Sequence, residues 1–347
     1  MFIGSPGMST NLTGTRRDRA VARDCDARHR GYRPATSRAR CTGRVGRSGK
    51  LGGMTTETRP DRVIPMRDEL SEEQIRSYRR DGFLVIDDFL DADTVGRLRT
   101  VLSEAVVGRG GARLPGEGRR SAAATGAGSD DRRRLLDALG KHRSKALKVL
   151  SQHVNLWQDD ERVRRFCLDP RLGRLACRLA GIGGVRIWHD QTMVKPAWGA
   201  PTGWHTDTPV FSFTHPGAST FWFALGDADL RNGCLHYLPG SHHDRVEVKG
   251  DLRRLDGLRL LNPAWEHAEP TPCPVRKGAL IVHSGDTAHA AGANMTPFAR
   301  SAFTISWQPE GAEFNGTANI LPEEILATLR PGDPLDFDEW NPLVYRK

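Results

Sequence analysis

Strand-like runs in the second half of the chain constrain its fold more than any other feature. Between residues 184 and 307 they read "VRIWHDQTMVK", "STFWFAL", "CLHYL", "GALIVH" and "RSAFTISW". Gly, Pro, Asn and Asp separate these runs, as expected for short strands. Because helical patterns come first and strands later, we expect an α+β chain with an all-β core. Closure of that core into a jelly roll or barrel would protect its edge strands.

The helical patterns begin at "LSEEQIRSYRRDG", residues 70–82. Ser71 and Gln74 have the spacing of a capping box, and Gly82 stands where a helix commonly ends. "FLVIDDF" (83–89) then predicts a strand, and residues 91–106 carry apolar side chains at helical spacing. Two or three further helices are expected between residues 132 and 180.

The positive charge of the chain lies in its first 53 residues. The whole chain carries +9, and this segment holds 11 Arg and Lys50 against three Asp. Its composition predicts a disordered basic tail over residues 1–65. Our preferred explanation of the tail is that it is upstream sequence included by an early translation start. Met54 or Met66 would then be the native first residue. An RNA-binding arm is the alternative.

The remainder carries no net charge and no basic stripe with aromatics, which argues against a nucleic-acid partner. No apolar run reaches the length of a membrane span, so we expect no membrane segment. The six Cys are scattered without a CxxC pattern, which suits a reduced, cytoplasmic protein.

We expect one domain over 66–310, with a C-terminal extension, 311–347, packed on it. Its Gly-rich loop, 108–131, is predicted to be disordered, and a lid is the alternative.

One short stretch, "GWHTDTPVF" (203–211), brings metal-binding side chains together. His205 and Asp207 are two apart, so on an extended chain they point to the same side. Such a pair alone proves little, because about one is expected by chance, and His242 with Asp244 repeats it. The third ligand would be His283 or His289. Two His and a carboxylate are typical of non-haem Fe(II) oxygenases, although zinc would also accept them.

The strand that follows these histidines predicts a pocket wall. Arg300, Ala302, Thr304 and Ser306 share one face of it, while aromatic and aliphatic side chains share the other. An Arg on a small, polar face is suited to a bidentate grip on a carboxylate.

These pieces together resemble the phytanoyl-CoA dioxygenase family of Fe(II)/2-oxoglutarate oxygenases. The resemblance runs from Leu70 to Trp307 through "LSEEQIRSYRRDGFLVIDDFL", "HDQTMVKP", "WHTD", "FWFALGDADLRNGCLHYLPGSH" and "HAAGANMTPFAR". In the last motif, Asn294 and Arg300 follow His289 by five and eleven residues, as in similar proteins. The resemblance implies a double-stranded β-helix (jelly-roll, cupin-like) core with flanking N-terminal helices.

The resemblance also implies the site. His205, Asp207 and His289 would hold Fe(II), and His242 would have a loop-structuring role. The cosubstrate 2-oxoglutarate would contact four residues: Arg300, Lys195, Gln191 and Trp222. Lys195 as an ordinary strand-end lysine is the alternative. Ala291 stands where many relatives have a Ser, which removes one hydroxyl contact to the cosubstrate.

The implied activity is that of a dioxygenase. It would hydroxylate an unactivated C–H bond of a small molecule while 2-oxoglutarate and O2 become succinate and CO2. Asp207 favours hydroxylation, because halogenating relatives have a small residue there. The alternatives are a non-catalytic jelly-roll binding protein with a vestigial site and a zinc hydrolase. The sequence does not identify the substrate. A CoA ester would need a basic patch, for which Arg253, Arg254 and Arg259 are candidates. We expect a monomer or homodimer.

Overall fold

The computed structural model describes residues 64–116 and 149–347. They belong to one compact unit, Pro60–Lys347. The predicted basic tail as far as residue 63, and most of the predicted loop 108–131, lie outside the described residues. Within the described part, no helix is long and apolar enough to cross a membrane.

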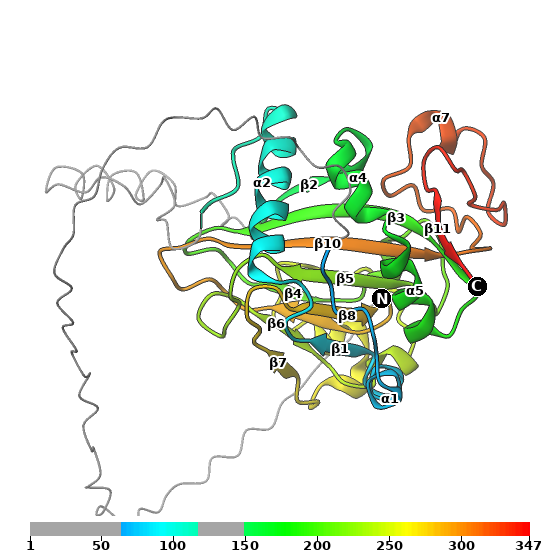
Figure 1. Ribbon diagram of the computed structural model, residues 1–347. Coiled ribbons are helices and arrows are strands. Elements are labelled where there is room, and N and C mark those ends of the chain that lie inside the picture. The colour runs from blue at the N-terminus through cyan, green and yellow to red at the C-terminus, as the bar shows by residue number, and fades with distance from the viewer. Residues whose placement is uncertain (1–63, 117–148) are drawn as a thin grey trace, which may run out of the picture. The chain divides into compact units, whose positions relative to one another are not determined.

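Two antiparallel sheets form the centre of this unit (Figure 1). The large sheet has the order β1-β8-β5-β10-β3-β11, and β2 also pairs with β3. Its strands are β1 (Phe83–Ile86), β2 (Ser151–Val154), β3 (Gly184–Lys195), β5 (Ser219–Ala224), β8 (Leu280–Ser284), β10 (Arg300–Pro309) and β11 (Leu343–Arg346). The small sheet has the order β4-β9-β6-β7. Its strands are β4 (Thr202–His205), β6 (Leu235–Tyr237), β7 (Thr271–Cys273) and β9 (His289–Ala291).

Helices cover the outer face of the large sheet (Figure 1). They are α1 (Glu72–Asp81), α2 (Ala92–Gly108), α4 (Glu161–Cys167) and α5 (Pro170–Ala180). The capping box is confirmed, because Ser71 and Gln74 bond reciprocally at the start of α1. Gly82 ends this helix with φ 82°, a left-handed conformation that favours glycine. The shorter helices are α6 (Leu258–Leu261), α7 (Glu323–Leu326), and the 3-10 turns η2 (Leu156–Gln158), η3 (Thr208–Val210), η4 (Ser241–His243) and η5 (Pro263–Trp265).

Alternation along the central strands divides the core into two parts. Phe303, Ile305 and Trp307 of β10 pack in the cluster that includes the helices. Trp222 of β5 and Ala302 of β10 point the other way and join a cluster that includes residues of the small sheet. The predicted two faces of β10 are therefore confirmed, and the face with the small side chains lies between the sheets.

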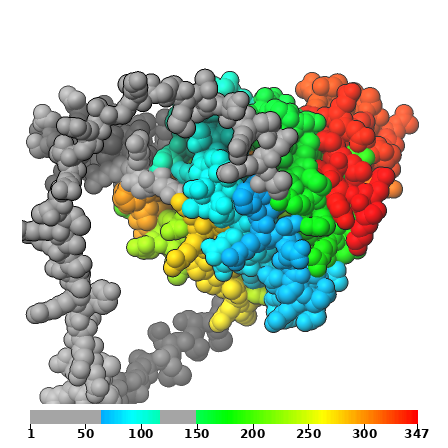
Figure 2. Space-filling view, in the orientation of Figure 1, coloured from blue at the N-terminus to red at the C-terminus, as the bar shows by residue number. Residues whose placement is uncertain are grey.

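The C-terminal residues pack on the end of the large sheet. β11 pairs with β3, and Phe314 bridges to Phe213. Aromatic and aliphatic side chains from this segment form a third cluster around Trp188. On the face shown in Figure 2, these residues (red) lie beside green residues of the α5 region, and the N-terminal helices (blue and cyan) lie on the other side of the green residues. The same segment reaches the cavity described next.

Candidate metal centre and pocket

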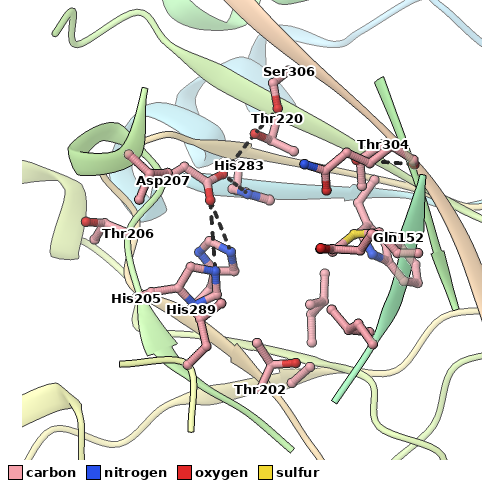
Figure 3. Close-up of a pocket in the computed structure, with 18 of the residues that line it drawn as sticks. Gln152, Thr202, His205, Thr206, Asp207, Thr220, His283, His289, Thr304 and Ser306 are labelled. Atoms are coloured by element: carbon pink, nitrogen blue, oxygen red, sulfur yellow. Dashed lines mark hydrogen bonds and ion pairs between the residues drawn. The ribbon is translucent and has the colours of Figure 1, made fainter. Parts of the chain in front are cut away.

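A cavity of about 260 Å³ opens between the two sheets. Both sheets line it, and the residues labelled in Figure 3 come from β2, β4, β5, β8, β9 and β10 and from the turn after β4. Six of the seven residues predicted for the site line it: His205, Asp207, His289, Arg300, Gln191 and Trp222. Lys195 is not among the lining residues.

The backbone of the small sheet brings the two histidines together. His205 ends β4, His289 begins β9, and the two are direct cross-strand partners. Asp207 follows in the turn into η3, where its backbone N–H donates to the carbonyl of Gly285 over 2.8 Å. The Asp207 Oδ1 atom lies 3.9 Å from Nε2 of His205 and 3.8 Å from Nε2 of His289.

Hydrogen bonds fix which nitrogen of each histidine faces the cluster. The Nδ1–H of His205 donates to the carbonyl of Gly203, and that of His289 donates to the carbonyl of Thr287. A carbonyl only accepts, so each ring carries its proton on Nδ1 and presents the lone pair of Nε2. Burial lowers the pKa of both imidazoles to about 4, which keeps them neutral at pH 7. Neutral imidazole is the form that binds a metal.

Two hydrogen bonds to one oxygen fix the orientation of the Asp207 carboxylate. Its Oδ2 accepts from Thr220 Oγ1 over 2.9 Å and from His283 Nε2 over 3.2 Å. Oδ1 is left facing the two histidines. Burial alone would raise the pKa of Asp207, but His289 and the bond from His283 hold it well below its usual range. Because His283 donates through Nε2, its Nδ1 accepts from the Tyr237 hydroxyl over 2.9 Å.

The donor set fits a divalent metal ion. Two Nε2 lone pairs and one carboxylate oxygen lie within 4.8 Å of one another in the cluster of His205, Asp207 and His289. The third member of the cluster is His289 rather than His283. His283 instead donates a hydrogen bond to Asp207. The repeated pair does not converge in this way, since His242 Nε2 bonds the carbonyl of Arg79 and Asp244 accepts from Trp265.

Arg300 is a buried cation that is not paired with any acidic side chain of the described residues. It is 4% exposed, its Nη2 donates to the carbonyl of Gly233, and its Nε has no partner among the described residues. Its guanidinium lies 5.3 Å from the centre of the Trp222 ring. Desolvation lowers the pKa of Arg300 to about 10, so it is still charged at pH 7. Burial of such a charge calls for an anionic ligand.

Lys195 lies behind the cavity wall. Its Nζ donates to the carbonyl of Ala200 over 2.7 Å and reaches Thr202 Oγ1 at 3.4 Å; Thr202 does line the cavity. Burial first, and the charge of Arg300 second, lower the pKa of Lys195 to about 7. Asn294 does not line the cavity either. Its Nδ2 donates to the carbonyls of Pro196 and Phe298. It thereby ties the loop after β3 to the loop before Arg300.

Several lining residues were missed by sequence reasoning. Strand alternation could have found Thr220, two before Trp222, and His189, two before Gln191. Gln152 of β2 and Asn319 of the C-terminal segment also line the cavity. Nothing in the local sequence around these two indicates a site. Of the aromatics considered for the mouth, Phe211 lines the cavity, whereas Phe213 is core and Trp198 is 59% exposed.

The two-sheet fold with a His-Asp-His cluster between the sheets defines a class, the Fe(II)/2-oxoglutarate-dependent oxygenases. The family model described as "Phytanoyl-CoA dioxygenase (PhyH)" matches residues 78–302. The chain therefore belongs to the phytanoyl-CoA dioxygenase family, as its sequence predicted. It is a 2-oxoglutarate-dependent non-haem iron dioxygenase with an intact facial triad of ligand residues.

Individual relatives agree with this assignment. Phytanoyl-CoA dioxygenase 1 of Oryza sativa subsp. japonica is 26% identical over 271 residues, which cover 73% of this chain and 94% of that protein. The solved carbocyclase SnoK from nogalamycin biosynthesis gives a TM-score of 0.62 at 25% identity, covering 81% of this chain and 99% of SnoK. The epimerase SnoN, solved with Fe3+, alpha ketoglutarate and nogalamycin RO, gives 0.55 at 25% identity, covering 79% and 98%. The predicted double-stranded β-helix core is confirmed.

Proposed function

We propose that this dioxygenase hydroxylates an unactivated C–H bond of a small molecule, with His205, Asp207 and His289 as the iron ligands. The convergence of two bare Nε2 atoms and the free Oδ1 of Asp207 is the observation that carries the proposal. When bound, iron supplies O2 activation, driven by conversion of 2-oxoglutarate to succinate and CO2. Three protein ligands leave further coordination positions for the cosubstrate and O2.

Arg300 would pair with the far carboxylate of 2-oxoglutarate. Its burial, its unpartnered Nε and the lack of an acidic partner among the described residues support this role. Trp222, whose ring lies against the guanidinium, would pack along the cosubstrate. Gln191 would contact the cosubstrate from β3, and Lys195 would act through Thr202. An orientation fixed from both sheets favours one reacting geometry.

Asp207 supports hydroxylation over halogenation, because a carboxylate occupies the position that a halide would need. Thr220 and His283 would keep that carboxylate turned, so that Oδ1 alone faces the iron. Phe211 and Leu252 line the same cavity and would exclude bulk water from the reacting centre. These residues bind, orient and shield, which is what the chain contributes to the reaction.

Ring closure or epimerisation is the second candidate, because SnoK and SnoN are described as a carbocyclase and an epimerase. The mass of the product separates the reactions. Hydroxylation adds one oxygen atom, ring closure removes two hydrogens, and epimerisation leaves the mass unchanged. A non-catalytic binding protein would release no succinate at all.

The test is succinate release in the presence of Fe(II), 2-oxoglutarate and O2 across a panel of small molecules, followed by mass spectrometry of the product. We expect one added oxygen that carries the isotope when labelled O2 is supplied. An unlabelled product of unchanged mass contradicts hydroxylation and leaves epimerisation. Absence of substrate-stimulated succinate across the panel, with iron bound, contradicts the proposal.

A further inference from the structure

His189 is a buried polar side chain with an unused atom at the cavity. It is 6% exposed and lines the cavity from β3. Its cross-strand partner on β10 is Ser306, whose hydroxyl bonds Thr220, which in turn holds Asp207. His189 therefore lies at the metal end of the cavity rather than at the Arg300 end. The metal-ligand cluster does not include it.

The Nδ1 atom of His189 has no partner among the described residues. Its Nε2 lies 2.9 Å from the Nε2 of Gln191. The amide of Gln191 donates in this contact, so the neutral ring carries its proton on Nδ1 and offers a donor there. Burial lowers the pKa of His189 to about 4, so the ring is neutral at pH 7. A buried donor without a partner costs free energy, unless a ligand supplies an acceptor.

Uncharged polar side chains share this wall with Met193 and Trp222. Gln191 and Thr304 are cross-strand partners, and Gln152 lies on the neighbouring strand β2. Apart from histidines, Asp207 and Arg300 are the acidic and basic side chains among the described residues that line the cavity. The proposed function uses the charge of Asp207 for iron and that of Arg300 for 2-oxoglutarate. No charge on the described walls is then left for a substrate.

Apolar side chains line the cavity beside these polar ones. Val210 and Phe211 follow the metal-binding turn, and Leu252 comes from the segment that bonds Gly203 beside β4. The ring centres of His189 and Phe211 lie 6.1 Å apart, so the polar and apolar side chains meet at the metal end. A ligand that satisfies both has oxygen atoms along one side and hydrocarbon along the other.

The three arginines considered above for a CoA ester each lie beside a carboxylate. Arg253 and Arg254, next to Leu252, bond Asp251 and Asp256 at 3.2 and 2.7 Å. Arg259 lies 3.9 Å from Glu266. Because each of these exposed arginines already has a carboxylate close by, the three do not provide an unpaired basic cluster for the phosphates of a CoA ester.

Resting on the proposed function, we infer that the substrate is an uncharged, oxygen-rich organic compound, one of whose oxygen atoms accepts a hydrogen bond from Nδ1 of His189. This bond sits beside the Asp207 cluster and positions the C–H bond near the metal. His189 is thus assigned as a residue that determines specificity. It would contact neither iron nor 2-oxoglutarate itself, although its Nε2 accepts from Gln191.

The test is an anaerobic titration of the protein loaded with Fe(II) and 2-oxoglutarate, followed through its weak visible absorption band. Two matched pairs of probes differ in charge: phenyl β-D-glucoside against phenyl β-D-glucuronide, and hydrocortisone against its 21-hemisuccinate. Palmitoyl-CoA and ectoine represent an anionic thioester and a zwitterion. We expect a neutral member to perturb the band and stimulate succinate release, with binding at least about tenfold tighter than its charged partner.

Two variants then test His189 itself with the best neutral probe. His189→Phe removes the donor and keeps an aromatic ring, so binding of that probe should weaken about tenfold. His189→Asn keeps a donor and should restore part of the loss. Both variants should still form the band with Fe(II) and 2-oxoglutarate, which shows that the fold and the metal centre survive. His243→Phe, at an exposed histidine outside the cavity, is the matched control.

Each outcome separates this inference from the proposed function. A band in the wild type, with a stronger response to palmitoyl-CoA, ectoine or the carboxylated probes, overturns the neutral substrate alone. The same holds if no neutral probe perturbs the band, or if His189→Phe binds the best probe as well as the wild type. Absence of the band in the wild type removes both the proposed function and the inference that rests on it.

Discussion

The two sheets that enclose the cavity differ in how they build their part of the site. The small sheet has strands of only three or four residues, yet it carries both histidines of the cluster as a direct cross-strand pair. The large sheet has strands of up to 12 residues and carries Arg300, Trp222 and His189 on one continuous face. Short strands thus fix one point in space, whereas long strands spread contacts along a surface.

The difference extends to hydrogen bonding. The cluster atoms are directed by bonds to the backbone or to neighbouring side chains, so that only the ligand atoms are left free. On the large sheet, Nε of Arg300 and Nδ1 of His189 have no partner among the described residues. We interpret the small sheet as preorganised to bind a metal. The large sheet offers unpaired donors that organic ligands would satisfy.

The largest effect should come from the small sheet. We expect His289→Ala to abolish iron retention and substrate-stimulated succinate release, because one of three protein ligands is lost. Iron content after anaerobic loading and desalting measures the first, and succinate the second. His242→Ala is the matched control, since that histidine bonds a carbonyl outside the cluster. Equal iron loss in both variants would refute the assignment of ligands.

Arg300→Met on the large sheet should rank second. We expect 2-oxoglutarate to bind about a hundredfold more weakly, because charge-assisted hydrogen bonds to its far carboxylate are lost. Iron retention should stay close to wild type, since Arg300 does not belong to the cluster. Calorimetric titration of 2-oxoglutarate into iron-loaded protein measures the change. An unchanged affinity would show that the cosubstrate anchors elsewhere.

Thr220→Val tests one of the two contacts, the other being from His283, through which the described part of the large sheet holds Asp207. The change removes the hydroxyl that holds Asp207 Oδ2, and we expect iron affinity to fall about tenfold. Thr192→Val is the matched control, because Thr192 is buried in the same sheet and its hydroxyl has no partner among the described residues. Competition with a metal indicator gives both affinities. If the two variants lose iron equally, the bond to Asp207 has no special role.

The smallest effect concerns Lys195 and pH. Its pKa falls from 10.5 to about 7 in the folded protein, mainly through burial. Between these values the unfolded chain binds a proton that the folded chain does not, so this residue makes stability rise with pH. We expect the stability of the wild type relative to Lys195→Met to increase from pH 7 to pH 10 in denaturant titrations of the metal-free protein. Parallel profiles would contradict this.

Much of the fold was predictable because local patterns agree with the tertiary structure. The capping box at Ser71 and the two faces of β10 follow from spacing alone. The pairing of His205 with His289 across 84 residues does not, since nothing local sets the register of two short strands. The family motif "HAAGANMTPFAR" supplied that choice, and the geometry shows His283 behind Asp207 instead.

Other parts of the site depend on tertiary packing that no pattern encodes. Lys195 shares a strand face with Gln191 by alternation, yet its ammonium turns to the carbonyl of Ala200 behind the wall. Asn319 reaches the cavity from the C-terminal segment because that segment packs on the end of the large sheet. Both outcomes depend on loop paths, which the sequence does not specify locally.

The most direct test of the account is anaerobic addition of Fe(II) and 2-oxoglutarate to the metal-free protein, observed in the visible range. We predict a weak charge-transfer band that requires both additions, is lost in His205→Ala, and needs far more 2-oxoglutarate in Arg300→Met. Absence of the band in the wild type, or a band of equal strength in His205→Ala, would contradict an iron centre held by His205, Asp207 and His289.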